Sequence, residues 1–375
     1  MKILHIITGL GDGGAEHTLY KLCKYDKIND HVVISLKAPE KYFQLLKKIN
    51  IKVYCLDINF FSILKFFNLV KLIIFLKPNL IQTWLVHGDF IGSIAARLAG
   101  FKEIVWNVRY SNLELKKTKL TTFLLLKILA KLSFFLPRSI VVVSKSARKN
   151  CINLGYCKDK LKFIPNGYDL SILKPSKKDK FDFKKKFKIK KQVVLIGSVA
   201  RYDPKKDHLN LLNAISKIKS ENTNFLCILV GFNIDKNNMN LVSEIKRLKL
   251  INHVKLLGQN SNISQVMNGL DIYIQSSSHG EGFPNVVAES MACGTPCVVT
   301  NVGDAAFIVG KSGWITSPKN PIKLARRIKQ AILEKESKNW NKRCLKARSR
   351  IKNNFEIKAM LNSYNDLWNK VCNKS

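Results

Sequence analysis

The chain has 375 residues, which is long for one typical domain and about right for two. Hydrophobic residues make up 46% of it, but lysine and arginine outnumber aspartate and glutamate by 64 to 26, giving a formal net charge of +38. This excess predicts a polyanionic partner (nucleic acid, an anionic membrane surface or phosphorylated substrates), although a lysine-biased genome would produce the same excess.

The nine cysteines form no Cys-x-x-Cys pair and no Cys/His cluster at zinc spacing. This pattern argues against a zinc module and fits a reducing, cytoplasmic compartment. The apolar run at the N-terminus is too short for a signal peptide, so we expect it to form a first strand.

The first half of the chain alternates short β-rich apolar runs with longer amphipathic segments. The expected strands are residues 2–7, 31–36, 52–56, 80–83, 103–108 and 139–143. The expected helices are residues 15–25, 41–48, 60–76, 90–98 and 118–136. This alternation is typical of a parallel sheet with helices on both faces.

Turn residues near position 165 and a lysine-rich stretch at 174–191 interrupt the alternation, which then resumes. We expect strands at 193–199, 225–230, 254–257, 272–275 and 296–300, and helices at 207–219, 241–249, 263–267, 284–292 and 355–371. The predicted division is an N-terminal Rossmann-like domain at 1–165, a weakly ordered basic linker at 166–190, a second Rossmann-like domain at 191–354, and a final helix and tail at 355–375.

A glycine-rich turn follows the first expected strand. Gly9, Gly11 and Gly14 match the dinucleotide pattern G-x-G-x-x-G. An NAD site also needs an acid at the end of the second strand, and none occurs before Glu40; Lys37 could serve NADP instead. The loop could equally let backbone approach a phosphate or sugar, or form a tight turn without a ligand.

Residues 276–298 carry two carboxylates on either side of a Gly-Phe-Pro turn, Glu281 and Glu289. Backbone N–H groups at the helix that follows can hold a phosphate, and the carboxylates can accept hydrogen bonds from sugar hydroxyls. A nucleotide sugar presents both groups. A glycosidase would also use two carboxylates, but a Glu289 inside a helix suits binding better than proton transfer.

Two further strand ends carry candidate side chains. Arg201 and Lys206 follow one strand and can converge on a pyrophosphate, with Lys205 as the competing lysine. His87 follows the strand at 80–83, where side chains face the ligand crevice of a parallel sheet. Arg109 ends another strand and could bind an anionic acceptor group or pair with a local acid. We assign no role to His279.

Together these segments resemble the retaining family-4 glycosyltransferases of the GT-B fold, which has two facing Rossmann-like domains. The likeness is sharp at residues 276–298 and moderate at the loop Gly13-Gly14-Ala15-Glu16, around His87 and at 196–207. It implies that Glu281 lies by the reacting carbon and Glu289 holds the ribose, that His87 contacts the donor sugar, and that the final helix crosses back to the N-terminal, acceptor domain. The implied catalytic residues are His87 and Glu281. The implied donor-binding residues are Gly13, Gly14, Arg201, Lys206, Gly282, Phe283, Pro284, Asn285, Val286 and Glu289.

The predicted function is transfer of a sugar from a nucleotide-sugar donor, expected to be UDP-linked, to a lipid-linked saccharide of a bacterial O-antigen, lipopolysaccharide or capsule. The chain has no Asp-x-Asp pair, so we predict chemistry without a metal or other cofactor. The alternatives are an NADP-dependent oxidoreductase and a basic nucleic-acid-binding protein, although the lysines are spread over the whole chain and no nucleic-acid-binding motif occurs.

Two apolar segments with interspersed lysines, 60–76 and 113–136, are too often interrupted by charge to cross a membrane. Lys116, Lys127 and Lys131 fall near one helical face. Such helices can lie on an anionic membrane surface, can pack on the sheet of their domain, or can do both. They predict a peripheral location on the inner face of the plasma membrane.

Overall fold

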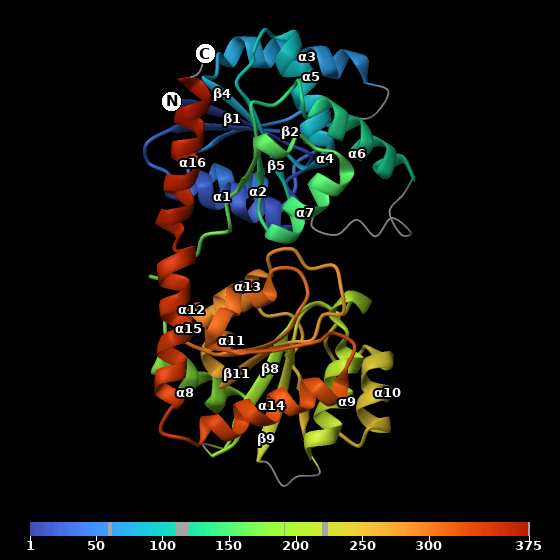
Figure 1. Cartoon of the computed structure of the whole chain (residues 1–375), viewed down its shortest axis with the longest axis vertical. Coiled ribbons are helices and arrows are strands. Elements are labelled where there is room, and N and C mark those ends of the chain that lie inside the picture. Colours follow the sequence, from blue (N-terminus) through green and yellow to red (C-terminus); the bar gives the residue numbers. More distant parts are fainter. Residues whose placement is uncertain (59–61, 110–119, 191, 220–223, 374–375) are drawn as a thin grey trace. The chain divides into compact units, whose positions relative to one another are not determined.

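The computed structural model describes residues 1–58, 62–109, 120–190, 192–219 and 224–373. The chain divides into two compact units, Met1–Asn166 with Ile357–Ser375, and Gly167–Glu356. Each unit is an α/β structure built on one parallel sheet, which confirms the predicted fold class (Figure 1).

The first unit contains a seven-stranded sheet in the order β3-β2-β1-β4-β5-β6-β7, with every pairing parallel. Its strands are β1 (Lys2–Ile7), β2 (Asp30–Ser35), β3 (Lys52–Cys55), β4 (Leu80–Trp84), β5 (Ile104–Val108), β6 (Ser139–Val142) and β7 (Leu161–Phe163). Its helices are α1 (Gly14–Tyr25), α2 (Lys41–Lys47), α3 (Ile63–Leu76), α4 (Leu85–His87), the π-helical turn η1 (Gly88–Gly92), α5 (Ser93–Leu98), α6 (Leu120–Leu132), α7 (Lys145–Leu154) and η2 (Lys158–Lys160).

Alternating residues of β1 explain how this sheet is covered on both faces. Leu4 and Ile6 pack into the core under α3 and α5, whereas Ile3 and Ile7 pack into the core under α1. Successive side chains of a strand point to opposite faces, so a strand with apolar residues on both faces needs helices on both sides. The C-terminal helix α16 (Ile357–Cys372) buries Tyr364 and Trp368 in the α1 face, so it belongs to the first unit, as predicted.

The second unit contains a six-stranded parallel sheet in the order β10-β9-β8-β11-β12-β13. Its strands are β8 (Val194–Val199), β9 (Phe225–Val230), β10 (Val254–Leu256), β11 (Ile272–Gln275), β12 (Cys297–Thr300) and β13 (Trp314–Thr316). Its helices are α8 (Lys177–Lys186), η3 (Pro204–Lys206), α9 (His208–Lys219), α10 (Met239–Arg247), α11 (Ile263–Gly269), α12 (Asn285–Ala292), α13 (Ala305–Val309), η4 (Gly310–Ser312), α14 (Pro321–Lys335) and α15 (Trp340–Phe355).

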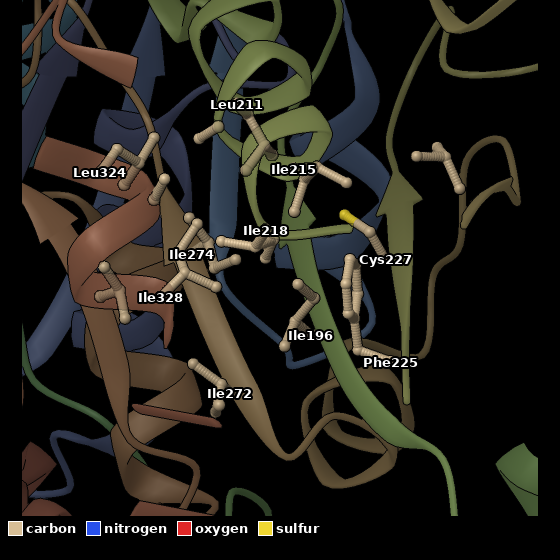
Figure 2. Packing of buried hydrophobic residues seen from close by; sticks show 14 of the residues in the cluster. Ile196, Leu211, Ile215, Ile218, Phe225, Cys227, Ile272, Ile274, Leu324 and Ile328 are labelled. Carbon is tan, nitrogen blue, oxygen red and sulfur yellow. The ribbon is translucent and has the colours of Figure 1, made fainter. Parts of the chain in front are cut away.

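One face of the second sheet packs against α9 and α14. Figure 2 shows Ile196 of β8 and Ile274 of β11 directed at Ile215 of α9 and Ile328 of α14. These side chains are all fully buried. The packing leaves the carboxyl ends of β8 and β11 to carry loops rather than core residues.

The prediction of a weakly ordered linker at 166–190 is wrong, because this stretch belongs to the second unit and contains α8. Ser176 caps α8 by accepting a hydrogen bond from the Asp179 N–H at 3.0 Å. Phe183 is fully buried, and its ring fills the space that a side chain at Gly269 would take. Among the described residues, no helix is long and apolar enough to cross a bilayer.

Candidate functional site

Both sheets have a topological switch point, and the sequence-predicted residues lie there. β1 lies between β2 and β4, and β8 lies between β9 and β11, so consecutive connections leave these central strands in opposite directions. Open α/β sheets bind ligands at the carboxyl ends of such strands. The loops that follow β1 and β4 carry Gly13 and His87, and those that follow β8 and β11 carry Lys206 and Glu281.

In the second unit, the two loops meet through an ion pair. Lys206 Nζ lies 2.6 Å from Glu281 Oε1, and the Ser277 hydroxyl donates to the same oxygen at 2.6 Å. Glu281 is 9% exposed, so its carboxylate is largely removed from water. Sequence reasoning gave Ser277 no role; its position two residues after the end of β11 was the available signal.

Backbone contacts hold the same two loops together. The Ser276 hydroxyl donates to the Lys206 carbonyl at 2.8 Å, and the Ser278 N–H donates to the Lys205 carbonyl at 2.9 Å. The Lys205 side chain packs over Gly280 instead of reaching Glu281. The structure thus distinguishes the two lysines that spacing left open and places Lys206 on the carboxylate.

Arg201 lies at the other end of the β8 loop. Its guanidinium donates to Asp203 Oδ2 at 3.0 and 3.1 Å, and its side chain is 65% exposed. Burial alone would raise the pKa of Asp203, but the Lys205 N–H and the Arg201 guanidinium lower it below its usual value. Arg201 is therefore accessible to an anion while remaining anchored to its own loop.

The turn at 281–284 has a fixed backbone because a neighbouring loop presses on it. Gly303 has a φ of +59°, and a Cβ there would lie 2.4 Å from the Glu281 carbonyl oxygen, so only glycine fits. The Asp304 N–H donates to the Gly282 carbonyl at 2.8 Å. Phe283 packs edge-on against Phe355, with ring centroids 5.4 Å apart. The Phe283 side chain therefore serves the core, and its backbone is what faces the site.

The turn leads directly into α12. Pro284 is its N-cap residue and makes no side-chain capping hydrogen bond, while Asn285 Oδ1 accepts from the Tyr168 hydroxyl at 2.7 Å. The first N–H groups of a helix have no intrahelical acceptor and attract anions. Val286 and Glu289 are half-buried on this helix, with Glu289 one turn beyond its start. Sequence reasoning did not single out Tyr168, which lies far from α12 in the chain.

In the first unit, the glycine loop is shaped by two carboxylates. Glu40 Oε2 accepts from the Leu10 N–H at 2.8 Å, and Gly13 is the N-cap residue of α1, with the Glu16 carboxylate folded against it. Burial raises the pKa of Glu16. Glu40 therefore supports the loop backbone. Gly14 is the first residue of α1.

His87 is brought beside this loop. It is the last residue of α4, and the next residue, Gly88, donates its N–H to the Thr8 hydroxyl at the end of β1, at 3.1 Å. Leu85 has a φ of +67°, a conformation that costs energy for a residue with a side chain and often marks functional turns. His87 is exposed and has no hydrogen-bond partner among the described residues.

Asp89 is a buried acid that sequence reasoning missed. It is 1% exposed, and the Thr83 hydroxyl donates to its Oδ1 at 2.6 Å. Burial raises the pKa of Asp89 to about 8, although the hydrogen bonds from Thr83 and the Asn107 backbone lower it in part. The spacing of two residues from His87 was the only sequence signal.

Arg109 holds together parts of the first unit that are far apart in the chain. Its guanidinium donates to Asn107 Oδ1 at 2.8 Å, to Asn166 Oδ1 at 2.6 Å and to the Tyr364 hydroxyl at 2.8 Å. These partners are neutral, so the described residues do not show the pairing with a local acid that was one of the two alternatives. His279, the other unassigned residue, shares a hydrogen bond of 2.7 Å with the Ser278 hydroxyl.

A buried group in the first unit could offer metal ligands: His5, Cys23 and His31 have ligand atoms within 4.8 Å of one another. One set of tautomers satisfies both imidazoles by hydrogen bonding. Trp84 Nε1–H donates to His5 Nδ1 at 3.2 Å, His5 Nε2–H to His31 Nδ1 at 2.9 Å, and His31 Nε2–H to an Asp26 oxygen at 3.1 Å. The arrangement fits a structural polar chain better than a metal centre.

Comparison with known proteins finds similar sequences and folds. The sequence model for the family described as "Glycosyl transferases group 1" matches residues 179–353. A putative glycosyltransferase, EpsF of Bacillus subtilis, is 27% identical over 144 residues, and the match spans 38% of this chain and 37% of that protein. The UDP-Gal:alpha-D-GlcNAc-diphosphoundecaprenol alpha-1,3-galactosyltransferase of Escherichia coli is 26% identical over 318 residues, or 82% of this chain and 79% of the relative.

The fold also matches a solved structure along its whole length. The crystal structure of Anabaena HepE in complex with UDP aligns with a TM-score of 0.87 and 23% identity, covering 99% of this chain and 100% of that one. Residues 179–353 therefore match the group 1 glycosyl transferases, and the chain has the GT-B fold.

Proposed function

We propose that this chain is a group 1 glycosyl transferase that moves a sugar from a UDP-linked donor to a lipid-linked saccharide, with retention of anomeric configuration, in the assembly of a bacterial surface polysaccharide. The observation that carries the proposal is the Lys206–Glu281 pair at 2.6 Å, next to the start of α12. It places a cation, a carboxylate and open helix N–H groups along one sheet edge. A nucleotide diphosphate sugar needs all three.

The departing diphosphate is the group that most needs stabilisation. The Lys206 ammonium has three N–H donors, so one can remain on Glu281 while others reach phosphate oxygens. Arg201 and the α12 N-terminus add positive potential to the same edge. In this proposal the acceptor hydroxyl attacks on the face that the diphosphate leaves, and a phosphate oxygen takes its proton. Glu289 holds the ribose, and Glu281 lies by the sugar.

The choice of donor and acceptor rests on relatives. HepE was crystallised with UDP, and the Escherichia coli relative is named for a UDP-galactose donor and a diphosphoundecaprenol-linked acceptor. We extend the UDP donor and the lipid-linked acceptor to this chain, with an O-antigen, lipopolysaccharide or capsule as the product. The sequence contains no Asp-x-Asp pair to hold a metal on the diphosphate, so we propose turnover without metal or other cofactor.

A panel of nucleotide sugars tests this function. Purified protein is incubated with each donor and a polyprenyl-diphosphate saccharide in the presence of EDTA, and nucleotide release and the anomeric configuration of the product are measured. We expect turnover with a UDP-sugar and a retained configuration. Failure to bind or turn over any donor would overturn the proposal, and activity that EDTA abolishes would overturn its metal-independent part.

The membrane part of the proposal rests on α3 and α6. Each helix packs one face on the sheet and exposes further apolar residues, so packing on the sheet leaves apolar side chains that a membrane surface could take up. The exposed apolar residues of α3 are Ile63, Leu64, Phe67, Ile74 and Phe75, and those of α6 are Leu120, Leu124 and Ile128. Lys71, Lys127 and Lys131 are exposed on the same helices, whereas Lys116 lies outside the described residues.

An anionic membrane leaflet fits this surface, because such a leaflet both takes up apolar side chains and attracts lysines. Each lysine near such a leaflet contributes about 1 kcal/mol. We propose reversible attachment to the inner face of the plasma membrane. In liposome flotation, binding should need anionic lipid, weaken as salt rises, and fall in Lys127→Gln/Lys131→Gln but not in the matched Lys236→Gln/Lys246→Gln. Equal flotation on neutral and anionic vesicles, or none on either, would defeat this part.

A further inference from the structure

The second unit contains a basic cavity at the amino-terminal ends of its central strands. The donor loops lie at the opposite, carboxyl-terminal ends of these strands. The volume of the cavity is about 860 Å³, within the usual range for small-molecule sites. Val194, the first residue of β8, and Asp271, which directly precedes β11, both line it. The donor loops leave the carboxyl ends of these same two strands, so the cavity is a separate place on the unit.

The wall of this cavity carries an excess of positive charge. Five lysines line it against two carboxylates, Asp271 and Glu336. These lysines are Lys177, Lys180, Lys184, Lys185 and Lys335. The side chain of Asp271 is 4% exposed and already engaged, because its Oδ1 lies 2.6 Å from Lys180 Nζ and 3.9 Å from Lys335 Nζ, and its Oδ2 accepts from the Leu195 N–H at 2.9 Å.

The pKa of Lys184 shows that the neighbouring lysines repel one another. Its ammonium donates to the Val193 carbonyl at 3.2 Å. Burial lowers the pKa of Lys184, and Lys180 and Lys335 lower it further, while Asp271 offsets part of the effect. A bound anion would reverse the repulsive contribution and favour all the charged ammonium groups together.

The cavity also has an apolar side. Phe181 and Ile189 line it, and Phe181 is 67% exposed, so an occupant of the cavity could cover its ring. A second hollow of about 590 Å³ shares Lys177, Lys180, Asp271 and Lys335 and adds Arg348. An occupant with an anionic head and a less polar body fits this combination.

We propose that this cavity is a second anion site, which binds a phosphate-bearing or diphosphate-bearing molecule independently of the donor nucleotide. Lys177 and Lys185 are the contacts to test, because they line the cavity from the surface of α8 and their replacement leaves the buried Asp271 pair intact. The phosphate could belong to a soluble metabolite or to a lipid headgroup.

Calorimetric titration with inorganic pyrophosphate tests the site in the full chain, with UDP present in excess and again without it. We expect the Kd for pyrophosphate to rise about 10-fold in Lys177→Gln/Lys185→Gln, from the loss of charged contacts. The matched Lys236→Gln/Lys246→Gln, which removes the same charge elsewhere in the unit, should bind like the unmodified protein. Because the two double variants are compared with each other, the result does not depend on UDP binding.

Absence of pyrophosphate binding together with unchanged flotation of the cavity variant would overturn the proposal, as would equal weakening in both double variants. Flotation on vesicles that contain phosphatidic acid assigns the source of the phosphate. Loss of flotation in the cavity variant alone indicates a lipid headgroup. Unchanged flotation, with weakened pyrophosphate binding, indicates a soluble ligand.

Discussion

Replacing Lys206 with glutamine should weaken UDP binding by about 10-fold to 100-fold. A hydrogen bond to a charged group contributes about 1.5–3 kcal/mol, and each 1.4 kcal/mol corresponds to a factor of ten in Kd. The 2.6 Å contact with Glu281 shows that the ammonium is held at the loop junction before any ligand arrives, so little ordering cost offsets its contribution.

The same substitution should also affect stability, because it removes the cation from a carboxylate that is only 9% exposed. Lys206 retains 24% side-chain exposure, so the pair lies between a surface ion pair and a buried one. We expect a loss of about 2 kcal/mol in the free energy of unfolding, between the ranges for those two cases. Urea denaturation measures this loss, and calorimetry with UDP measures the affinity.

Lys205→Gln is the matched control, because Lys205 is the adjacent residue in the same turn but packs over Gly280. It should leave UDP affinity within about twofold of the unmodified protein, since it removes only a screened charge. An effect of Lys205→Gln as large as that of Lys206→Gln, or no effect of either, would refute the assignment of Lys206 to the diphosphate.

Three other variants test separate parts of the account. Glu289→Ala should weaken UDP binding and leave the urea midpoint nearly unchanged; normal affinity would remove Glu289 from the ribose site. His87→Ala should lower turnover more than UDP binding, because His87 belongs to the other unit from the proposed nucleotide residues; unchanged turnover would remove it from the site. Asp26→Asn should reduce the acid sensitivity of folding. Burial alone would raise the pKa of Asp26, but hydrogen bonds from His31, Asn29 and the Ile28 N–H lower it to about 2, so the carboxylate contributes up to about 2 kcal/mol at neutral pH that is lost as pH falls from about 5 towards 2. If the free energy of unfolding depends on pH in the same way in this variant and in the unmodified protein, the proposed role of Asp26 in the buried hydrogen-bonded chain is contradicted.

The central strands were predictable because burial on both faces makes them continuous apolar runs. β1, β9 and β11 have the predicted bounds, whereas the three-residue strands β7 and β13 were not identified. The sequence pattern of α8 is dominated by lysines and suggests disorder. The tertiary contact of Phe183 with Gly269 makes α8 part of the unit, and local composition cannot reveal that contact.

The candidate site, like the fold, could be predicted only in part. Strand ends identified the loops that carry Lys206, Glu281 and His87, because parallel strands direct their carboxyl ends to one edge. The sequence could not choose between Lys205 and Lys206, since that choice depends on the backbone turn at η3. Nor could it find the partners of Arg109, which include Tyr364, a residue brought to the first sheet by α16.

The structure of the protein with UDP bound tests the central claim most directly. The account predicts the diphosphate at Lys206, Arg201 and the N-terminus of α12, with the ribose on Glu289 and the glycine of position 303 still pressed against the turn at 281–284. UDP bound with its diphosphate away from Lys206 and α12, or no UDP at the carboxyl edge of the second sheet under saturating conditions, would contradict it.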